Sequence, residues 1–437
     1  MTSAAPPAAT LDLGARGTSP AVTSQGHTVS YHEMAELIDR VDLRRGWLDA
    51  TGLPVPDALA AVFAAARSGV PVLVADPDGR RHTDSHRAPA DVAASAPPGT
   101  FLIAVTSGTS GRPRPVLRTA ASWTTSFAPL AELAGVSARD RVLLTGPLHA
   151  TMHLFAAVHT LWLGAELTDR PDHATAVHAV PAVLGYLLNA LPPTAPLRTA
   201  VVAGSALPAR IADEAASRGV AVTEYYGAAE LSFVAAARRP GPLRTFPGAE
   251  VQIRDGEIWV RSPYLAAGYA AGVSGPLRRD RDGFATVGDL GEWIDGELPH
   301  RGGLRVLGRG DAAITTGGAT VIAEEIEAAL CALPGVAAAA VVGVPHRRLG
   351  EVVAAVLEPT VLEPAGEDSV DAKNLDGIRA AARLVLRGPS LPRRWYTVRR
   401  LPRTGNGKIA RAVVGQAVRL AVAGEYLPDG LRLRPLP

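Results

Sequence analysis

The feature that most constrains the fold is a repeated alternation between segments of helical periodicity and short, continuous apolar runs. Residues 55–69, "VPDALAAVFAAARSG", follow a helical pattern, residues 70–76, "VPVLVAD", form an apolar run, and the cycle recurs between residues 141 and 227. Strands that are joined through helices run parallel, and helices cover both faces of their sheets. The pattern therefore predicts an α/β domain with parallel sheets and helical layers, and no repeat of fixed length accompanies it.

Other segments refine this expectation. The periodicity predicts a helix after His27 as far as residue 52, and another helix over residues 176–191, "AVHAVPAVLGYLLNAL". From about Phe246 the pattern changes to short alternating runs separated by Asp-Gly and Gly-Gly pairs, as in residues 249–262, "AEVQIRDGEIWVRS". Asp-Gly pairs favour two-residue hairpin turns, so this part is predicted to form a small antiparallel β-subdomain.

A further α+β pattern begins near residue 308 and predicts a separate C-terminal domain. The expected organisation is a large N-terminal domain over residues 1–307 and a small, mobile α+β domain over residues 308–437. Residues 1–25 are rich in Ala, Pro, Ser and Thr and are expected to form a mobile arm. They lack the cationic start and the continuous apolar segment of a signal peptide.

Composition and charge argue against several classes of function. The chain has 44 basic and 42 acidic residues and a net charge of +2, so no basic field indicates a nucleic acid or an anionic membrane surface as partner. The most apolar segments are interrupted by His, Pro or Gly and are too short to span a membrane. The chain has a single cysteine, Cys331, so it cannot form an internal disulfide, which fits a cytoplasmic protein. Cys331 has helical spacing with apolar neighbours, which indicates a buried core thiol.

Residues 105–115, "VTSGTSGRPRP", combine four hydroxyl side chains, two glycines and two arginines at the end of the apolar run "TFLIAV". Small residues let backbone N–H groups converge on an anion, while hydroxyl and guanidinium groups add donors. The stretch therefore predicts a phosphate-binding loop. It is not the G-x-x-x-x-G-K-[ST] loop, because Gly108 and Gly111 are three residues apart. Taken alone, it is also compatible with an ordinary turn that carries solvated arginines.

This stretch and four further segments, in the same order, resemble the adenylate-forming superfamily, which contains acyl-CoA and aryl-CoA synthetases, peptide-synthetase adenylation domains and luciferases. The segments are "AGSALPARI" with "EYYGAAE", "VGDLGEW", "LGRGDAAITTGGATVIAEEIE" and "LPRTGNGKIAR". The resemblance covers about residues 101–411, and residues 1–100 are shorter than the usual N-terminal region. It implies that a carboxylic acid and ATP, with Mg²⁺ at the phosphates, form an acyl- or aryl-adenylate whose acyl group passes to a thiol.

The sequence does not identify the carboxylic acid substrate or the acceptor of the acyl group. CoA is the favoured acceptor, and a carrier-protein thiol, an amine or another small nucleophile are the alternatives. A non-catalytic nucleotide-binding relative is a further alternative, suggested by the shortened N-terminal region and by two departures from the family pattern. Arg114 stands where Lys is common, and Ala229 stands where a Thr or Ser hydroxyl, worth about 1–2 kcal/mol, usually contacts the α-phosphate. The oligomeric state is also open, with a homodimer as one alternative.

The resemblance assigns roles to individual residues. Lys408 is expected to contact both the attacking carboxylate and the α-phosphate, and Glu230 is expected to bind Mg²⁺. Tyr226 would stack on adenine, while Asp289 and Arg309 would bind the ribose hydroxyls. Considered without the resemblance, Lys408 has the pattern of a solvated surface lysine and Asp289 that of a hairpin cap.

The remaining nucleotide and acceptor positions come from the same motifs. The residues expected to hold the phosphates and the rest of the nucleotide are Thr106, Ser107, Gly108, Thr109, Ser110, Arg114, Gly204, Ser205 and Gly227. Asp311 is expected to be the hinge of the small domain. Gly317 and Gly318 would let a thiol-bearing arm pass close to the backbone and thus complete the nucleotide and CoA site.

The acyl pocket is expected near residues 146–165, where His149 and His153 lie four apart on one face of a predicted helix. A zinc pair is not favoured, because no Glu lies between the two histidines and no third ligand is indicated. Ser232 and Phe233 are further candidates for the pocket wall. No Asp in "LHATMHL" is available to bind an ammonium group, which argues for an acid without an α-amino group.

Overall fold

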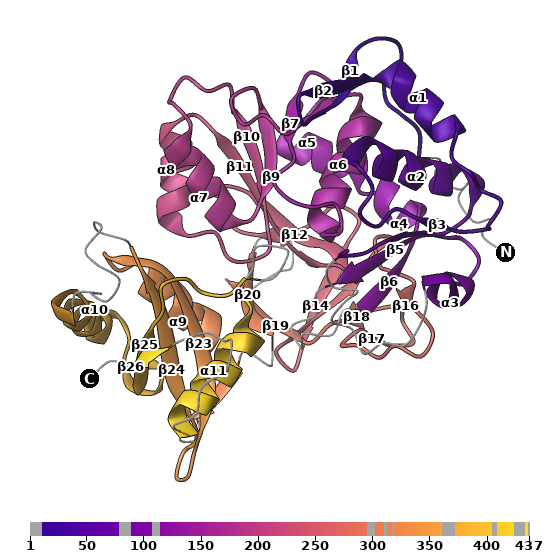
Figure 1. The fold of residues 1–437 in the computed structure, drawn as a ribbon. Helices are drawn as coiled ribbons and strands as arrows, with labels where there is room; N and C mark the ends of the chain where they lie inside the picture. The colour runs from indigo at the N-terminus through magenta and orange to yellow at the C-terminus, as the bar shows by residue number, and fades with distance from the viewer. Residues whose placement is uncertain are drawn as a thin grey trace. The chain divides into compact units, whose positions relative to one another are not determined.

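The computed structural model describes residues 11–77, 89–106, 114–294, 302–309, 313–316, 319–360, 372–403, 409–423 and 433–435 (Figure 1). Contacts within the chain divide it into two compact units. The large unit comprises Met1–Gly108, Arg112–Val287 and Trp293–Arg305, and the small unit comprises Thr109–Gly111, Gly288–Glu292 and Val306–Pro437. The boundary expected at residue 308 stays a prediction.

The largest sheet of the large unit has nine strands in the order β13-β12-β11-β10-β9-β7-β8-β1-β2. The strands from β1 through β8, β7, β9 and β10 to β11 pair in parallel, whereas β2, β12 and β13 pair antiparallel at the two edges. The strands are β1 (Pro20–Ser24), β2 (His27–Ser30), β7 (Arg141–Leu143), β8 (Glu166–Thr168), β9 (Ala176–Ala179), β10 (Thr199–Val202), β11 (Ala221–Ala228), β12 (Ser232–Arg238) and β13 (Arg244–Thr245). The predicted parallel sheet is confirmed.

Helices pack on both faces of this sheet, with α7 and α8 on one side and α5 and α6 on the other (Figure 1). The β10 strand shows why, because Ala200 and Val202 belong to the core under α7 and α8, whereas Val201 belongs to the opposite core. A strand buried on both faces needs a continuous apolar run, which is the pattern in the sequence. The helices of this part are α1 (Tyr31–Asp39), α2 (Val55–Ser68), α5 (Phe127–Ala134), α6 (Thr151–Leu163), α7 (Pro181–Ala190) and α8 (Ala209–Ser217).

Two of the expected helices begin later than predicted. The residues directly after His27 form β2, and α1 starts only after Ser30, where Ser30 and Glu33 make a reciprocal capping box. The helix predicted as far as residue 52 is also wrong at its end, because α1 ends at Asp39 and the chain then forms β3 (Leu48–Asp49). The prediction of a helix over residues 176–191 is wrong at its start, because the chain first forms β9. The α7 helix begins at Pro181, since the fixed φ of proline and its missing N–H suit the first turn of a helix and not its interior.

A five-stranded sheet, in the order β16-β6-β5-β4-β3, carries the ends of the predicted phosphate loop. The β5 and β6 strands pair antiparallel with Thr106 opposite Arg114, so the two ends of the predicted loop lie side by side. The strands are β3 (Leu48–Asp49), β4 (Val72–Val74), β5 (Thr100–Thr106), β6 (Arg114–Thr119) and β16 (Gly268–Tyr269), and the short helices α3 (Pro89–Ala94) and α4 (Ala121–Thr124) lie beside them.

The predicted antiparallel subdomain is also present. Its sheet has the order β17-β18-β15-β19-β20, with β14 paired to β15. The β14–β15 hairpin turns at Asp255 and Gly256, both with positive φ, as a two-residue turn requires. The strands are β14 (Glu250–Arg254), β15 (Glu257–Arg261), β17 (Arg278–Arg279), β18 (Ala285–Thr286), β19 (Asp289–Ile294) and β20 (Gly303–Arg309).

The small unit is built on a sheet in the order β22-β21-β24-β25-β26, with β23 paired to β24. Alternate residues of β23 face two cores, Ala339 and Val341 toward α9 and α10, and Ala340 and Val342 toward α11. Cys331 is only half-buried at the edge of the first core. The elements are β21 (Ala313–Thr316), β22 (Ala319–Ile322), α9 (Ala323–Cys331), β23 (Val336–His346), β24 (Gly350–Pro359), α10 (Ala372–Val385), the 3-10 turn η3 (Gly388–Ser390), β25 (Arg394–Thr397), α11 (Arg411–Ala423) and β26 (Arg434–Pro435).

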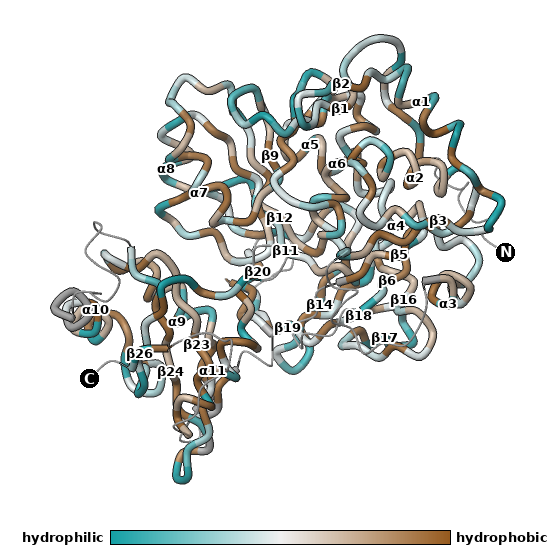
Figure 2. The backbone as a smooth tube through the Cα atoms, in the orientation of Figure 1, coloured by the Kyte–Doolittle hydropathy of each residue, from teal (hydrophilic) through white to brown (hydrophobic). Residues whose placement is uncertain are grey.

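The hydropathy along the chain follows this packing. Hydrophobic residues predominate along β23, β24 and α9, whereas the turn between β23 and β24 is hydrophilic (Figure 2). Within the described part of the chain, no helix combines the length and the apolar character that a membrane span requires.

Candidate active site

The carboxyl ends of the parallel strands in the nine-stranded sheet bring several polar residues to one edge. Thr145 follows β7, His178 lies near the end of β9, and the exposed Gly204 and Ser205 follow β10. The Thr145 hydroxyl donates a hydrogen bond of 2.8 Å to the His178 carbonyl and so ties β7 to β9. Ligands of open α/β sheets bind outside this edge, where strands end and the chain turns.

The next strand along the sheet, β11, carries the predicted adenine and metal residues in a tight hairpin with β12. A Cβ atom on Gly227 would lie 1.8 Å from the Ser232 carbonyl oxygen, so only glycine fits at this point. Ser232 has a φ of 59°, in the left-handed region that few side chains adopt. The hairpin leaves Tyr226 half-buried at the strand end and places Glu230 within the turn.

The Glu230 carboxylate is held from a second segment, residues 264–269. The Tyr269 hydroxyl donates to Glu230 Oε1 at 2.8 Å, and the Ala266 N–H donates to the Glu230 carbonyl at 2.8 Å. Burial and the neighbouring Glu230 charge raise the pKa of Tyr269 above its ordinary value, so the phenol stays a donor at neutral pH. Glu230 itself is 7% exposed and has a fixed orientation.

Three arginines interact with Glu230 or with the residues that hold it. Arg118, on β6, is 0% exposed and reaches the Ala229 carbonyl at 3.2 Å, while Arg279 donates to the Ala266 carbonyl. Burial lowers the pKa of Arg118 to about 9, opposed by the attraction of the Glu230 charge. Burial and Glu230 raise the pKa of Tyr269, and the positive charge of Arg114 opposes part of this increase. The site therefore combines one oriented carboxylate with positive charge, which suits a phosphate-bearing ligand.

The donor set around Glu230 also fits Mg²⁺. No group of three or more His, Cys, Asp or Glu side chains that could form a complete metal cage exists among the described residues. Mg²⁺ does not need such a cage, because it is commonly bound by one or two carboxylates together with substrate phosphates and waters. A single oriented carboxylate next to cationic phosphate ligands matches that mode.

The two histidines expected at the acyl pocket have different environments. His153 is buried, with Nε2 at 3.3 Å from the Thr145 hydroxyl and Nδ1 at 3.4 Å from the Pro147 carbonyl oxygen. His149 is partly exposed, with Nε2 at 3.9 Å from Asp76 Oδ2. Their assignment to the acyl pocket stays a prediction.

The other two pocket candidates lie in the β11–β12 region. Phe233 is buried, with ring centroids at 4.6 Å from Tyr225 and 5.1 Å from Phe155. The Ser232 hydroxyl accepts a hydrogen bond of 3.0 Å from Arg118. Both side chains thus have structural contacts of their own, and their role in substrate binding remains a prediction.

Several predicted residues belong to the small unit. Asp289, at the start of β19, is 7% exposed. Burial raises the pKa of Glu324, and the charges of Glu327 and Asp289 add to this increase. Arg309 is the last residue of β20. A Cβ atom on Gly308 would lie 1.5 Å from Glu324 Oε2, so Glu324 packs directly against the strand that ends at Arg309. The ribose-binding roles of Asp289 and Arg309 stay predictions.

The ends of the segment that carries Lys408 are also described. Arg403 and Ile409, which flank this segment, form an isolated antiparallel bridge. Arg411, at the start of α11, donates to Glu327 Oε2 at 2.7 Å and to Glu324 Oε1 at 3.2 Å. The predicted site residues that lie outside the described part of the chain are Ser107, Gly108, Thr109, Ser110, Asp311, Gly317, Gly318 and Lys408, and only the backbone is described for Thr106.

Sequence reasoning missed three residues of the Glu230 environment, Arg118, Tyr269 and Arg279. Arg118 had a usable signal, because it is a charged residue in the run "RPVLRT", directly after the buried Val116 and Leu117. Tyr269 and Arg279 had no such signal in the sequence, since they reach the site only through the pairing of β16 with β6 and through the loop that follows.

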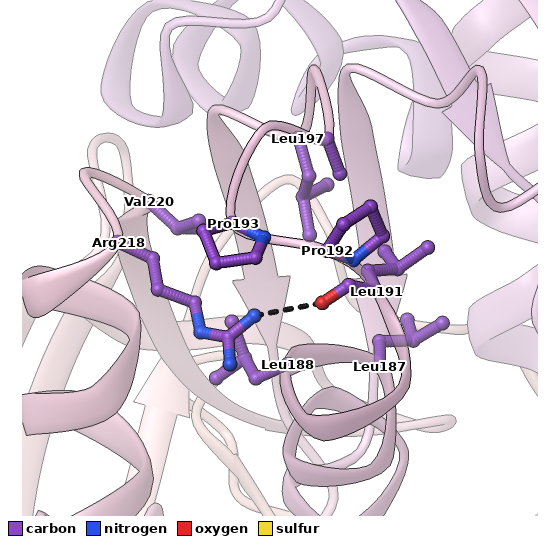
Figure 3. A pocket seen from close by; sticks show the side chains of 9 residues that line it. Leu187, Leu188, Leu191, Pro192, Pro193, Leu197, Arg218 and Val220 are labelled. Atoms are coloured by element: carbon purple, nitrogen blue, oxygen red, sulfur yellow. Dashed lines mark hydrogen bonds between the residues drawn. The ribbon is translucent and has the colours of Figure 1, made fainter.

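The apolar pocket under α7 is not part of this site. It is lined by Leu187, Leu188, Leu191, Pro192, Pro193, Ala195, Leu197, Arg218 and Val220 (Figure 3). Its one charged side chain, Arg218, donates to the Leu191 carbonyl at 2.9 Å and pairs with Glu214. No acid, hydroxyl or imidazole faces this pocket among its lining residues, so it offers no group for catalysis.

Comparisons with known proteins agree with this arrangement. Residues 55–270 match the family of AMP-binding enzymes, and residues 325–408 match the C-terminal domain of AMP-binding enzymes. A probable 2-succinylbenzoate–CoA ligase of Mycobacterium tuberculosis is 30% identical over 346 residues, which cover 72% of this chain and 83% of the relative. An uncharacterized acyl–CoA ligase of Bacillus subtilis is 29% identical over 352 residues, which cover 73% of this chain and 68% of the relative.

The fold has close counterparts among solved structures. ATP-bound MatB from Rhodopseudomonas palustris superposes with a TM-score of 0.74 at 23% identity, covering 92% of this chain and 96% of the other. The o-succinylbenzoate CoA synthetase of Bacillus subtilis, in complex with its acyl-adenylate intermediate, superposes with a TM-score of 0.71 at 21% identity, covering 90% and 94%. At these identities the likeness establishes the fold.

Proposed function

The chain belongs to the family of AMP-binding enzymes, and on that premise we propose that it is an AMP-forming ligase that joins a carboxylic acid to CoA. The observation that carries the proposal is the Glu230 carboxylate, oriented by Tyr269 at 2.8 Å and set among Arg118, Arg279 and Arg114. The names of the two curated relatives, both CoA ligases, support CoA as the acceptor.

In the proposed first half-reaction, an acid oxygen attacks the α-phosphorus of ATP, pyrophosphate leaves and an acyl-adenylate remains. The reactants are both anions, so positioning and charge neutralisation account for most of the rate. Glu230 would hold Mg²⁺ next to the phosphates, and the ion would supply positive charge there when bound. Arg114 and the hydroxyls of the β5–β6 loop would bind the departing pyrophosphate, and Lys408 would contact the acid oxygen and the α-phosphate.

In the proposed second half-reaction, the CoA thiol attacks the acyl carbonyl, its proton is lost to solvent or a base, and AMP leaves with the bonding electrons. Gly317 and Gly318 would border the path of the thiol arm, and Asp311 would act as the hinge between the two half-reactions. An acid without an α-amino group remains the expected substrate class.

Product analysis tests the proposal. The protein is incubated with ATP, Mg²⁺, CoA and a panel of aliphatic, dicarboxylic and aromatic acids, and mass spectrometry follows acyl-CoA and AMP. At least one acid should give both products in equal amounts. An acyl-adenylate that accumulates in the presence of CoA would contradict CoA as the acceptor and favour a carrier-protein thiol or an amine. ATP binding without any AMP would favour the non-catalytic alternative that Ala229 and Arg114 suggest.

Two variants connect this activity to the site. E230Q removes the carboxylate charge and K408A removes the ammonium group, and each should lower product formation by about 100-fold or more, as expected for groups that stabilise transition-state charge. E214Q is a suitable control, because Glu214 is a surface residue of α8 that pairs with Arg218. Equal activity of E230Q and E214Q would remove Glu230 from the mechanism.

A further inference from the structure

Arg118 is a fully buried cation next to the Glu230 carboxylate. It occupies a position of β6 between the buried Leu117 and the half-buried Thr119, and none of its side chain reaches solvent. Moving a guanidinium group out of water is unfavourable unless hydrogen bonds and an opposite charge compensate it. A buried arginine inside a strand therefore needs a structural or functional reason.

The partners of Arg118 are main-chain carbonyls and a hydroxyl. Nη1 donates to the Ala229 carbonyl at 3.2 Å, and Nη2 donates to the Ser232 hydroxyl at 3.0 Å. Nη2 also donates to the carbonyls of Tyr264 at 2.8 Å and Ser122 at 3.2 Å. Nε has no hydrogen-bond partner among the described residues. No carboxylate touches the guanidinium in these contacts, and the Glu230 charge favours its protonated form through space.

These contacts lie on the two segments that hold Glu230. Ala229 and Ser232 flank Glu230 in the β11–β12 turn, where Ser232 has the unfavourable φ of 59°. Tyr264 lies two residues before Ala266, whose N–H donates to the Glu230 carbonyl. One guanidinium thus joins both supports of the carboxylate and holds a strained turn in place.

The hydrogen bond from Arg118 to the Ala229 carbonyl holds a residue that departs from the superfamily pattern. By resemblance to the superfamily, the residue before Glu230 usually carries a hydroxyl, and this chain has Ala229 instead. The chain holds the same residue through its main chain, by the Arg118–Ala229 hydrogen bond. Fixed main-chain dipoles and oriented side chains reduce the reorganisation that binding a metal–nucleotide complex requires.

We propose that Arg118 is a positioning residue that orients Glu230 toward the metal–nucleotide complex by joining the 229–232 turn to residue 264. It acts through Glu230 and does not touch the substrates. The inference rests on the proposed function, because it takes Glu230 as the Mg²⁺ ligand.

The test compares the Mg²⁺ dependence of adenylation in matched variants. R118M keeps an unbranched apolar side chain and removes all donors, whereas R118K keeps the charge and a fraction of the contacts. Acid-dependent ATP–pyrophosphate exchange is measured against total Mg²⁺ at fixed ATP, together with the melting temperature. R118M should raise the Mg²⁺ concentration at half-maximal rate by about 10-fold, the lower range for residues that orient metal ligands, and R118K should lie between R118M and wild type.

L130A is the control for a general loss of stability. Leu130 is 0% exposed in α5, and its truncation creates a core cavity without removing a hydrogen bond of Arg118 or Glu230. L130A should lower the melting temperature and leave the Mg²⁺ dependence unchanged. If R118M fails to fold, S232A, which removes one acceptor of Arg118, should shift the Mg²⁺ dependence in the same direction by a smaller factor.

The outcomes separate this inference from the function on which it rests. Absence of acid-dependent exchange in the wild type would overturn the proposed function. An active wild type and an inactive E230Q, with R118M, R118K and S232A all showing the Mg²⁺ dependence of L130A, would overturn the positioning role alone. Such a result would mean that Arg118 only supports the fold.

Discussion

Two arginines, Arg118 in the large unit and Arg411 in the small unit, show two ways of stabilising a cation away from water. Arg118 is surrounded by carbonyls and a hydroxyl, and burial lowers its pKa to about 9. Arg411 donates to the carboxylates of Glu324 and Glu327, and their charges raise its pKa although burial opposes this. Carbonyl partners orient a guanidinium without neutralising it, whereas carboxylate partners neutralise it and join two helices.

The difference indicates different tasks for the two residues. In the large unit the charge of Arg118 remains available to attract Glu230, and its donors hold the turn that carries Glu230. In the small unit the ion pairs connect the first residue of α11 to α9, directly after the segment 404–408 that ends at Lys408. We therefore expect Arg118 to matter mainly for binding and catalysis, and Arg411 mainly for the stability of the small unit.

The largest predicted effect is an opposite response of the two units to acid. Burial lowers the pKa of His178 to about 3 and that of His159 to about 4, from an ordinary 6.5. The unfolded chain binds protons at these histidines below pH 6.5 and the folded unit does not, so the large unit loses stability as the pH falls. Glu224, whose pKa burial raises, offsets part of this loss. The net loss from pH 7 to pH 5 should be about 2–3 kcal/mol.

The buried carboxylates of the small unit change its stability in the opposite direction as the pH falls. Burial raises the pKa of Glu324 and Glu327 above 4.5, so the folded unit binds protons more readily than the unfolded chain as the pH falls toward 4.5. The small unit should therefore keep its stability over this range. Urea unfolding at pH 7 and pH 5, read separately for each unit by pulsed hydrogen exchange and mass spectrometry, measures both responses.

Two histidine variants check the origin of the acid response. H178F should remove about half of the loss in the large unit, since it removes one of the two strongly affected histidines. H32F should leave the loss unchanged, because His32 is exposed on α1. Equal losses of stability in the two units would contradict the claim that the buried histidines destabilise the large unit in acid and that the buried glutamates do not destabilise the small unit.

A smaller effect is expected from R411M, which leaves Glu324 and Glu327 without their cation. The free energy of unfolding of the small unit should fall by about 2 kcal/mol, less than for a fully buried ion pair because 31% of the Arg411 side chain is exposed. The large unit should keep its stability. R419M, on the exposed face of the same helix, should change neither unit, and an equal loss in R411M and R419M would exclude the ion pairs as the cause.

The smallest effect is expected from Y269F, which removes one hydrogen bond to Glu230 and no charge. A hydrogen bond to a charged group contributes about 1.5 kcal/mol, which corresponds to about 10-fold in kcat/KM for the Mg²⁺–ATP complex. Steady-state adenylation kinetics measure this change, with Y186F as the control because Tyr186 is 70% exposed on α7. An unchanged kcat/KM in Y269F would mean that the hydroxyl does not orient Glu230 during the reaction.

The sequence predicted those features that have a local cause. Continuous apolar runs such as that of β10 arise from burial on both faces of a sheet, and the Asp255–Gly256 pair arises from the positive φ of a hairpin turn. The pattern does not predict the strand that carries His178, because its apolar run has helical periodicity, although Pro181 marks the true start of α7. Helical and extended periodicities are hard to separate in a short apolar run, so the error has a physical origin.

The contacts around Glu230 could not be predicted in the same way. Tyr269 is 39 residues from Glu230 in the chain, and Arg118 is 111 residues from Ala229. These pairs depend on the register of β16 with β6 and on the bulge in the β11–β12 pair, neither of which leaves a periodic signal. The motif indicated Glu230 itself, whereas the residues that orient it emerge only from tertiary structure.

The central claim is that the chain adenylates a carboxylic acid with Glu230 as an essential group. Acid-dependent exchange of radiolabelled pyrophosphate into ATP tests it most directly, since the assay reports the first half-reaction without any acceptor. The account predicts exchange with at least one acid of the panel in the wild type and in E214Q, and a loss of about 100-fold or more in E230Q. Exchange that persists undiminished in E230Q, or folded wild-type protein that shows none with any acid, would contradict it.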